Sequence, residues 1–297
     1  MKDAKENSRQ ARNILVLGGT GKTGRRVAER LEARGASVRI GSRTAEPPFD
    51  WEDPQNWSEA LNGIDAVYVT FQPDLAVPGA RTAIEKLTAL AIENGIQKMV
   101  LLSGRGEREA ELCEQIVMNA GADWTIVRAS WFNQNFSESF FLDPILAGHV
   151  ALPKGETLIP FVDADDIADV ATEALLDDKH NGQIYELTGP RQLTFKQVTE
   201  EISKAAGREI EFNAITMAEY AKMLGEFQVP KDYIWLINYL FTEVLVDENS
   251  SVSSDIEKVL GRKARDFAEY ARETAATGIW NPASNIEQIE PAQAALA

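Results

Sequence analysis

The sequence has one cysteine, two histidines and no long apolar run, and each shortage excludes a class of protein. Because Cys113 is single, the chain cannot form an internal disulfide, which indicates a reducing, cytoplasmic setting. No stretch approaches the roughly 20 apolar residues that cross a bilayer. The first residues, MKDAKENSRQ, carry charge but lack the apolar segment of a secretory signal. We therefore expect a cytoplasmic protein without a membrane segment.

Basic residues are also scarce. The chain has 30 Lys and Arg against 46 Asp and Glu, a net charge of −16. That field repels a phosphate backbone and an anionic membrane surface, because both bind proteins through basic patches. The charge balance argues against direct nucleic-acid or membrane binding. It favours a small-molecule substrate, or a protein partner if the protein is a regulator.

Two histidines supply neither a His-rich metal centre nor an obvious Ser-His-Asp triad. His149 is expected to end an apolar helix, where it could cap the carboxyl terminus. His180 lies in the turn-like stretch DDKHNGQ, where we expect it to be exposed. The sequence therefore predicts no metal site and assigns no catalytic residue.

From Asn13 onward, short apolar runs alternate with amphipathic stretches, which is the pattern of βαβ units. Several runs are continuous in Val, Ile and Leu, as is typical of strands covered on both faces. The predicted strands are 13–17, 37–40, 66–70, 98–102 and 124–128. The predicted helices are 24–34, 81–93 and 107–119, each followed by a glycine suited to the left-handed cap. The fold class is α/β, a Rossmann-type doubly wound parallel sheet.

The pattern changes after Arg128. Two further strands are predicted at 160–162 and 184–187, with a helix over 163–176 that Asp163 would cap. Between Tyr233 and Leu245 the apolar residues repeat at helical spacing, which favours core packing. We predict a dinucleotide-binding domain over 12–189, a smaller, mostly helical substrate domain over 190–280, and flexible termini at 1–11 and 281–297.

The most informative stretch reads ILVLGGTGKTGRRVAERL, in which a buried strand leads into glycines and then a helix. Glycine is needed there because the chain turns sharply and a Cβ would hold the backbone away from a pyrophosphate. The free N–H groups and the helix dipole then receive its charge. Two registers fit, one beginning at Gly19 (G-x-G-x-x-G) and one at Gly18 (G-x-x-G-x-x-G). A P-loop is excluded because Val16 stands where its first glycine is required.

The end of the second predicted strand indicates which dinucleotide binds. NAD-preferring proteins usually carry an acid there, which holds the ribose 2′-hydroxyl. Here the strand ends in Ile40-Gly41-Ser42-Arg43, and no acid follows until Glu46. Arg43 could clamp a 2′-phosphate and Ser42 could hydrogen-bond to it. We therefore predict NADP(H) in preference to NAD(H).

The motifs together resemble those of the NmrA-like atypical short-chain dehydrogenases/reductases. The stretches GGTGKTG, FDWEDPQNWSEAL, KMVLLSG, ADWTIVRASWFNQNF and IPFVDADDIADVA follow that family's order, and DIEKVLGRKARDFAEYARETAATGIW fits its ending. The resemblance covers roughly residues 12–280. It is strongest to the branch that contains bacterial NAD(P)H-binding proteins and fungal ergot-alkaloid reductases such as festuclavine and agroclavine dehydrogenases.

The resemblance implies a place for each part of the cofactor. The pyrophosphate would be wrapped by Gly18, Thr20, Gly21, Lys22, Thr23 and Gly24, and the adenosine phosphate met by Ser42 and Arg43. The adenine would be bordered by Asp50 and Trp51, after a third strand. The middle of the cofactor would follow Thr70, Phe71 and Gln72, which end a fourth strand, and Ser103 and Gly104, which end a fifth. The nicotinamide would be faced by Ala129, Ser130, Trp131 and Phe132, with Asn135 and Phe136 shaping the pocket.

One departure from ordinary short-chain dehydrogenases bears on mechanism. Those enzymes use Tyr-x-x-x-Lys, in which the lysine lowers the tyrosine pKa so that it can protonate an alkoxide. Aligned to that pattern, this chain has Gly106 and Ala110, and none of its six tyrosines precedes a lysine by four residues. The standard carbonyl-reducing machinery is absent from the sequence.

Two functions remain open. The first is an NADPH-dependent reductase of an already electrophilic molecule (an imine or iminium ion, a quinone or a conjugated alkene), which the enzyme would hold against aromatic walls. The candidate walls are Trp131, Phe132, Phe136, Phe161, Tyr233 and Trp235, although core packing would explain any one of them. Asp163 or Glu114 could place a carboxylate near a cationic substrate. The alternative is that Asp163 caps a helix and Glu114 is a solvated residue. The second function is an NADP(H)-binding redox sensor that acts through a protein partner, as the resemblance to NmrA implies.

Overall fold

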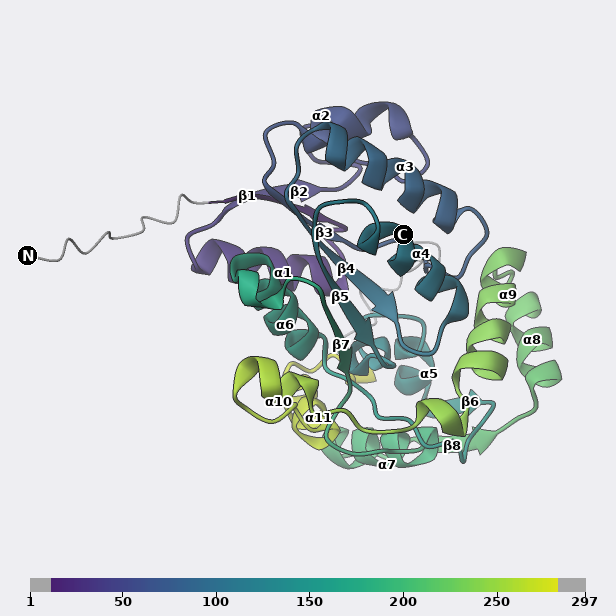
Figure 1. Cartoon of the computed structure of the whole chain (residues 1–297). Coiled ribbons are helices and arrows are strands. Elements are labelled where there is room, and N and C mark those ends of the chain that lie inside the picture. The colour runs from purple at the N-terminus through teal and green to yellow at the C-terminus, as the bar shows by residue number, and fades with distance from the viewer. Residues whose placement is uncertain (1–11, 283–297) are drawn as a thin grey trace, which may run out of the picture.

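Six parallel strands form the central sheet in the order β2-β1-β3-β4-β5-β7 (Figure 1). The structure, a computed structural model, describes residues 12–282. The strands of this sheet are β1 (Asn13–Leu17), β2 (Ser37–Gly41), β3 (Ala66–Val69), β4 (Lys98–Gly104), β5 (Asp123–Ala129) and β7 (Gln183–Leu187). The chain adds β2 on one side of β1 and then β3 on the other. That reversal makes a topological switch point at the carboxyl end of β1, which is where such sheets bind ligands.

Helices cover both faces of this sheet, which confirms the predicted α/β fold class. Alternate residues of β1 point to opposite faces: Ile14 packs with α1 and α6, whereas Leu15 packs with α2, α3 and α4. The helices on the two faces are α1 (Lys22–Ala33) and α6 (Ala164–Leu176), and α2 (Trp57–Leu61), α3 (Ala80–Glu93) and α4 (Arg108–Met118). Asp163 caps α6 as predicted, since its side chain accepts a hydrogen bond from the N–H of Asp165 at 2.8 Å.

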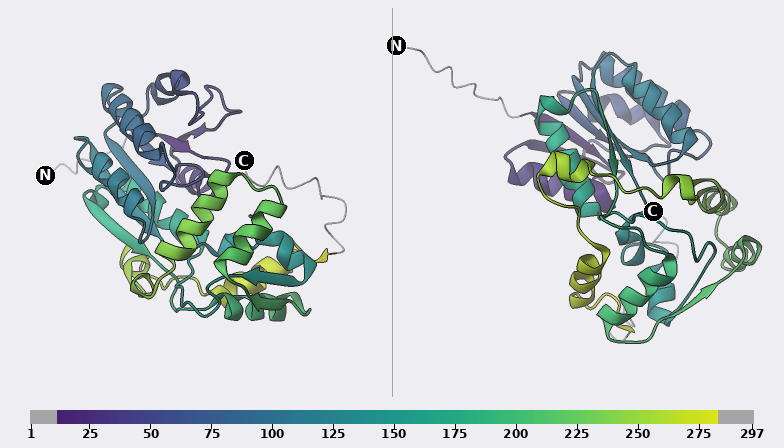
Figure 2. Two further views of the ribbon diagram at one scale, coloured as in Figure 1. Left: turned by 90° about the vertical axis from the view of Figure 1, so that its right-hand side faces the viewer. Right: turned by 60° about the horizontal axis from the view of Figure 1, so that its bottom comes forward.

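The rest of the described chain forms a second layer at the carboxyl end of the sheet (Figures 1 and 2). It holds a parallel pair of short strands that the sequence did not predict, β6 (His149–Leu152) and β8 (Glu211–Ala214). Its helices are α5 (Leu142–Ala147), α7 (Phe195–Ala206), α8 (Met217–Glu226), α9 (Lys231–Tyr239), the π-helical turn Leu240–Val244 and α11 (Phe267–Ala276). The short helix α10 (Asp255–Leu260) instead packs against α6 and β7, and its Ile256 belongs to the core on that face of the sheet. Short 3-10 turns occupy Pro54–Asn56, Asn133–Phe136, Asp178–His180 and Asp247–Asn249.

An aromatic core holds this second layer together. Phe136, Phe141, Phe161 and Phe195 are each at most 2% exposed and make mutual ring contacts. The cluster also contains Phe241 from the predicted apolar stripe, which confirms core packing for that residue. Residues on both sides of position 189 therefore build one core, and the predicted division at 189 stays a prediction.

Four expectations from the sequence are wrong. The segment 160–162 forms only an isolated bridge between Val162 and Phe132, because β7 occupies the sheet edge beside β5. A strand was also expected just before Asp50, but the structure has only a bridge between Asp50 and Asp53 there. The strand before Thr70 is therefore the third of the chain and not the fourth. His149 begins β6 rather than ending a helix. His180 is 2% exposed, with Nδ1 2.8 Å from the hydroxyl of Tyr185.

Two further expectations were flexible termini and the lack of a membrane-spanning segment. The predicted flexible termini, 1–11 and 281–297, lie outside the described residues except for 281 and 282. Within residues 12–282, no helix combines the length and the apolar character needed to cross a bilayer.

Candidate dinucleotide-binding site

The glycine turn between β1 and α1 is built for close backbone approach. Gly18 has a φ of 61°, and a Cβ there would lie 2.5 Å from Oγ1 of Thr70. Gly21 is the N-cap of α1, and its N–H donates to the carbonyl of Gly18 at 2.8 Å. A Cβ on Gly24 would collide with the carbonyl group of Gly18. A Cβ on Gly19 would also lie 2.8 Å from Cγ2 of Ile40, so the glycines that begin the two registers, Gly18 and Gly19, both have a steric reason to lack a side chain.

The start of α1 presents backbone donors with no partner of their own. No side chain caps α1, and the first backbone hydrogen bond at its start runs from the N–H of Arg25 to Gly21. Within the described chain, the N–H groups of Lys22, Thr23 and Gly24 therefore have no acceptor, and they point along the helix axis. Together with the helix dipole they suit a pyrophosphate, so the turn fits a dinucleotide.

The predicted adenine-side and middle residues come together at the carboxyl end of β3. Nε1 of Trp51 donates to the carbonyl of Thr70 at 3.2 Å, and the rings of Trp51 and Phe71 are 4.8 Å apart. Nε2 of Gln72 lies 3.6 Å from where a Cβ on Gly21 would stand. The residues chosen from separate parts of the sequence thus line one continuous edge. Their role in holding the cofactor stays a prediction.

The end of β2 adjoins the same turn, because the N–H of Gly19 donates to Gly41 at 3.4 Å. Ser42 follows directly, with its hydroxyl 3.4 Å from that of Thr44. Arg43 is exposed and, within residues 12–282, forms no ion pair. A guanidinium that is not neutralised by the protein is available for a phosphate group.

A neighbouring segment fills the space beside Gly106, the position that the sequence alignment gives to the tyrosine. Gly106 has a φ of 78°, and a Cβ there would collide with the side chain of Asn249. That side chain is fixed by a 2.9 Å hydrogen bond from Nδ2 to the carbonyl of Val244. Arg105 holds the same segment, since Nη1 donates to the carbonyls of Asn249 and Ser251 at 2.7 and 2.9 Å. No tyrosine could project from position 106 without displacing this segment.

The side chain of Ser103 hydrogen-bonds to a buried ion pair and does not face a cavity. Its hydroxyl donates to Oε1 of Glu114 at 2.7 Å, and Nη2 of Arg128 lies 2.6 Å from Oε2. The side chain of Glu114 is completely buried, so the idea that it is solvated is wrong. With both oxygens engaged by protein groups, Glu114 is a structural anchor between β4, α4 and β5.

Two carboxyl groups that the sequence did not single out lie side by side where β3 and β4 end. Glu107 is 6% exposed, and its carboxyl group covers Gly104 so closely that a Cβ there would collide with it. Burial, and then the neighbouring carboxyl of Asp74, raise the pKa of Glu107 well above its usual value. Burial also raises the pKa of Asp74. Because burial and the neighbouring carboxyl group both disfavour the charged form of Glu107, the pair favours a state that holds a proton.

The predicted substrate residues are divided between an open edge and the core. Trp131, Phe132 and Asn135 are half-buried and directly follow β5, whereas Phe136 and Phe161 are buried in the aromatic core. Tyr233 and Trp235 lie on α9, where Trp235 is 45% exposed. The ring of Trp131 is 5.5 Å from that of Phe241, which lies just after α9. Ala129 and Ser130 lead from β5 into this segment.

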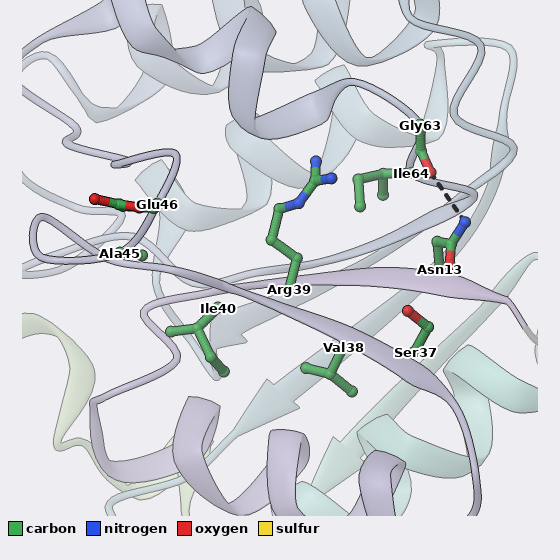
Figure 3. A pocket seen from close by; sticks show the side chains of 9 residues that line it. All are labelled: Asn13, Ser37, Val38, Arg39, Ile40, Ala45, Glu46, Gly63 and Ile64. Atoms are coloured by element: carbon green, nitrogen blue, oxygen red, sulfur yellow. Dashed lines mark hydrogen bonds between the residues drawn. The ribbon is translucent and has the colours of Figure 1, made fainter.

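The structure also has a cavity at the edge of the sheet. It has a volume of about 450 Å³ and lies along β2, between Arg39 and the loop residues Ala45 and Glu46 (Figure 3). Its other end reaches Asn13, whose side-chain amide donates to the carbonyl of Gly63 at 3.2 Å. This end is the amino-terminal edge of the sheet, opposite the glycine turn. The cavity therefore extends along the edge strand, from the amino-terminal edge of the sheet to the loop that follows β2.

A sheet with its switch point at β1, a glycine turn and a row of free N–H groups define a dinucleotide-binding protein of the Rossmann type. The chain belongs to the NAD(P)H-binding family, which matches residues 18–178. This membership confirms the resemblance to the NmrA-like atypical short-chain dehydrogenases/reductases drawn from the sequence motifs.

Curated relatives match over almost their whole length. The chain is 31% identical to prestalk A differentiation protein A of Dictyostelium discoideum, over 88% of this chain and 92% of that protein. It is 30% identical to an NAD(P)H azoreductase of Xenophilus azovorans, over 89% and 98%. It is 29% identical to festuclavine dehydrogenase of Aspergillus fumigatus, also over 89% and 98%.

Solved structures confirm the fold at lower identity. The triphenylmethane reductase of Citrobacter sp. in complex with NADP(H) superposes with a TM-score of 0.70 at 17% identity, covering 89% of this chain and 99% of that one. NmrA, a negative transcriptional regulator, in complex with NADP gives 0.69 at 18% identity, covering 91% and 97%. At these identities the likeness concerns the fold alone.

Proposed function

We propose that the protein is an NADPH-dependent reductase that delivers a hydride to an electrophilic small molecule, namely an imine or iminium ion, a quinone or a conjugated alkene. The observation that supports the proposal is the space at Gly106, the position that the sequence alignment gives to the tyrosine, because a side chain there would collide with Asn249. Without that tyrosine, an ordinary ketone lacks its proton donor. An acceptor that is already electron-poor needs chiefly a hydride at the correct distance and angle.

The relatives support a redox role for this family. One is named an NAD(P)H azoreductase and another festuclavine dehydrogenase, and both align over 98% of their length. The half-buried residues Trp131 and Phe132 after β5 offer flat apolar surfaces beside the expected nicotinamide position. Within the described chain, the indole nitrogen of Trp131 is buried without a hydrogen-bond partner. A bound substrate with an acceptor atom would satisfy it.

The direct test follows NADPH absorbance with purified protein and a panel of quinones, cyclic imines and enones. With at least one acceptor we expect NADPH to be oxidised at least about tenfold faster than in the enzyme-free control. This threshold is far below the rate accelerations that enzymes usually reach. Oxidation no faster than the control for every member would reject the reductase. If NADPH and NADP+ then bound with different affinities, the redox-sensor alternative would gain support.

Preference for NADP(H) gives a second prediction. We expect Arg43→Ala to weaken NADPH binding by about tenfold or more, because a charge-assisted hydrogen bond contributes about 1.5–3 kcal/mol. NADH binding should stay within about twofold of the wild type, since NADH lacks the 2′-phosphate. Isothermal calorimetry measures both.

Arg81→Ala is the matched control for Arg43→Ala, because Arg81 is an exposed arginine on α3 whose ion pair is to Glu85. It should leave both affinities unchanged. Equal losses for NADPH and NADH in Arg43→Ala would show that Arg43 does not read the 2′-phosphate, and tighter NADH binding by the wild type would reverse the assigned preference.

A further inference from the structure

We propose that the carboxyl pair of Asp74 and Glu107 supplies the proton that completes reduction of a neutral acceptor, in place of the absent Tyr-x-x-x-Lys dyad. The inference rests on the proposed reductase function and identifies the proton donor that the sequence left unassigned. It starts from the placement of the pair at the carboxyl ends of two central strands.

The sheet order brings the pair to the reactive end of the cofactor. The adenosine side is set by Ser42 and Arg43 after β2, and the pyrophosphate by the glycine turn after β1. The remaining half of a dinucleotide must then extend past β3 toward β4 and β5. Asp74 lies in the loop after β3 and Glu107 in the loop after β4, with its carboxyl group over the backbone of Gly104.

Glu107 is buried from solvent, but one of its carboxyl oxygens has no hydrogen-bond partner among the described residues. This oxygen is Oε2, which is itself buried. The second layer covers this region through Tyr239 at the end of α9, whose hydroxyl accepts a hydrogen bond from the backbone N–H of Arg108. The ring of Trp235 stacks on Tyr239 at 5.7 Å. The burial of Glu107 disfavours its charged form and so keeps the proton on the carboxyl pair.

The other ionisable groups nearby are less suited to donate. The hydroxyl of Ser103 already donates to Glu114, whose charge is balanced by Arg128. Burial raises the pKa of Tyr239, so this phenol holds its proton more tightly. Glu114 also raises the pKa of Glu107 through its negative charge. Among these groups, Glu107 is the acid that is both protonated and uncommitted.

The chemistry balances with one hydride and one proton. NADPH transfers a hydride, with its electron pair, to the electrophilic atom of a quinone or enone and becomes NADP+. The O–H bond of Glu107 breaks as the proton moves to the resulting oxyanion, and a carboxylate remains beside Asp74. Solvent returns one proton to the pair after product leaves. A cationic acceptor needs no proton at all, because hydride addition alone neutralises it.

This difference between acceptors provides the test. Glu107→Gln keeps the size of the side chain but cannot release a proton. With a quinone we expect kcat to fall by about 100-fold, within the range attributed to general acid catalysis. With a triphenylmethane dye cation we expect the rate to stay within about threefold of the wild type. Glu109→Gln, an exposed acid on the same helix, is the matched control and should leave both rates unchanged.

The outcomes separate the two proposals. A wild-type protein that oxidises NADPH neither with the dye cation nor with any member of the panel of quinones, cyclic imines and enones overturns the reductase and, with it, the donor. A wild type that reduces both, with Glu107→Gln slowed equally on both or on neither, overturns only the proton donor. NADPH affinity measured for each variant shows whether the cofactor site is intact, so loss of binding is not mistaken for loss of proton transfer.

A second readout does not depend on activity. Because the folded protein keeps a proton on the pair that the unfolded chain releases near the ordinary pKa, the free energy of unfolding should fall as pH rises toward the raised folded pKa. The Glu107→Gln variant should lose this decline. Urea unfolding at about pH 5 and about pH 9 measures it, with stability lost toward the higher pH in the wild type. An equal pH dependence in both proteins would show that Glu107 is not protonated and overturn the assignment.

Discussion

Replacing Gly24 with alanine should weaken NADPH binding by about 100-fold, which corresponds to about 2.7 kcal/mol. The new Cβ would collide with the carbonyl group of Gly18, and both partners are backbone that cannot rotate away. Either α1 or the strand-to-turn junction must shift, and the N–H groups at the start of α1 then lose their alignment with the pyrophosphate. Calorimetric titration with NADPH measures the loss. We also expect the substitution to lower the free energy of unfolding, measured by urea unfolding, by about 3 kcal/mol.

Gly35→Ala is the matched control for Gly24→Ala. Gly35 follows the other end of α1 with a φ of 78°, and a Cβ there would meet nothing within 4 Å. The left-handed conformation should cost about 1 kcal/mol of stability without changing NADPH affinity. If Gly24→Ala bound NADPH as tightly as the wild type, the glycine turn would not be the pyrophosphate site and the assignment of the cofactor edge would fail.

Arg128→Met should destabilise the protein by about 3–5 kcal/mol, the usual cost of leaving a buried charge without its partner. Glu114 is completely buried, and Arg128 contacts both of its oxygens, with Nη2 2.6 Å from Oε2. Methionine would leave only the hydroxyl of Ser103 to compensate the carboxylate. Urea unfolding gives the change in free energy. The second variant, Arg128→Met with Glu114→Gln, should recover a large part of the loss because the charge is removed.

An exposed pair calibrates this result. Arg34 is 52% exposed and lies 2.7 Å from Glu173, so Arg34→Met should cost less than about 1 kcal/mol. A cost for Arg128→Met as small as that for Arg34→Met would mean that Glu114 becomes protonated or solvated when its partner is removed. The double variant being less stable than Arg128→Met would likewise contradict the electrostatic explanation.

Local patterns in the sequence were sufficient to predict the sheet, its covering helices and the cofactor turn. Continuous apolar runs such as 13–17 require burial on both faces, and a parallel sheet between helices provides it. Gly35 was predicted to follow the end of a helix because a left-handed residue is needed there, and its φ of 78° confirms this. Gly24 was predicted as a glycine of the pyrophosphate turn, and its close approach to the carbonyl of Gly18 gives a steric reason for glycine there.

Predictions that depended on side chains meeting across the fold were weaker. His180 was expected to be exposed because its neighbours are polar, yet it is buried against Tyr185. Phe136 and Phe161 were chosen as pocket walls for their aromatic character, but they pack inside the second layer. An aromatic residue looks the same in sequence whether it faces a substrate or another aromatic ring.

The sequence by itself therefore determined the α/β fold and the glycine turn, because both depend on residues that are close along the chain. Only the tertiary structure brought Asp74 beside Glu107 and placed Asn249 against Gly106. A carboxyl group in a loop acquires a raised pKa only through burial and a neighbouring charge, and both come from segments that are distant in sequence. The one available signal was that each acid follows the carboxyl end of a parallel strand, where Rossmann-type sheets gather their functional groups.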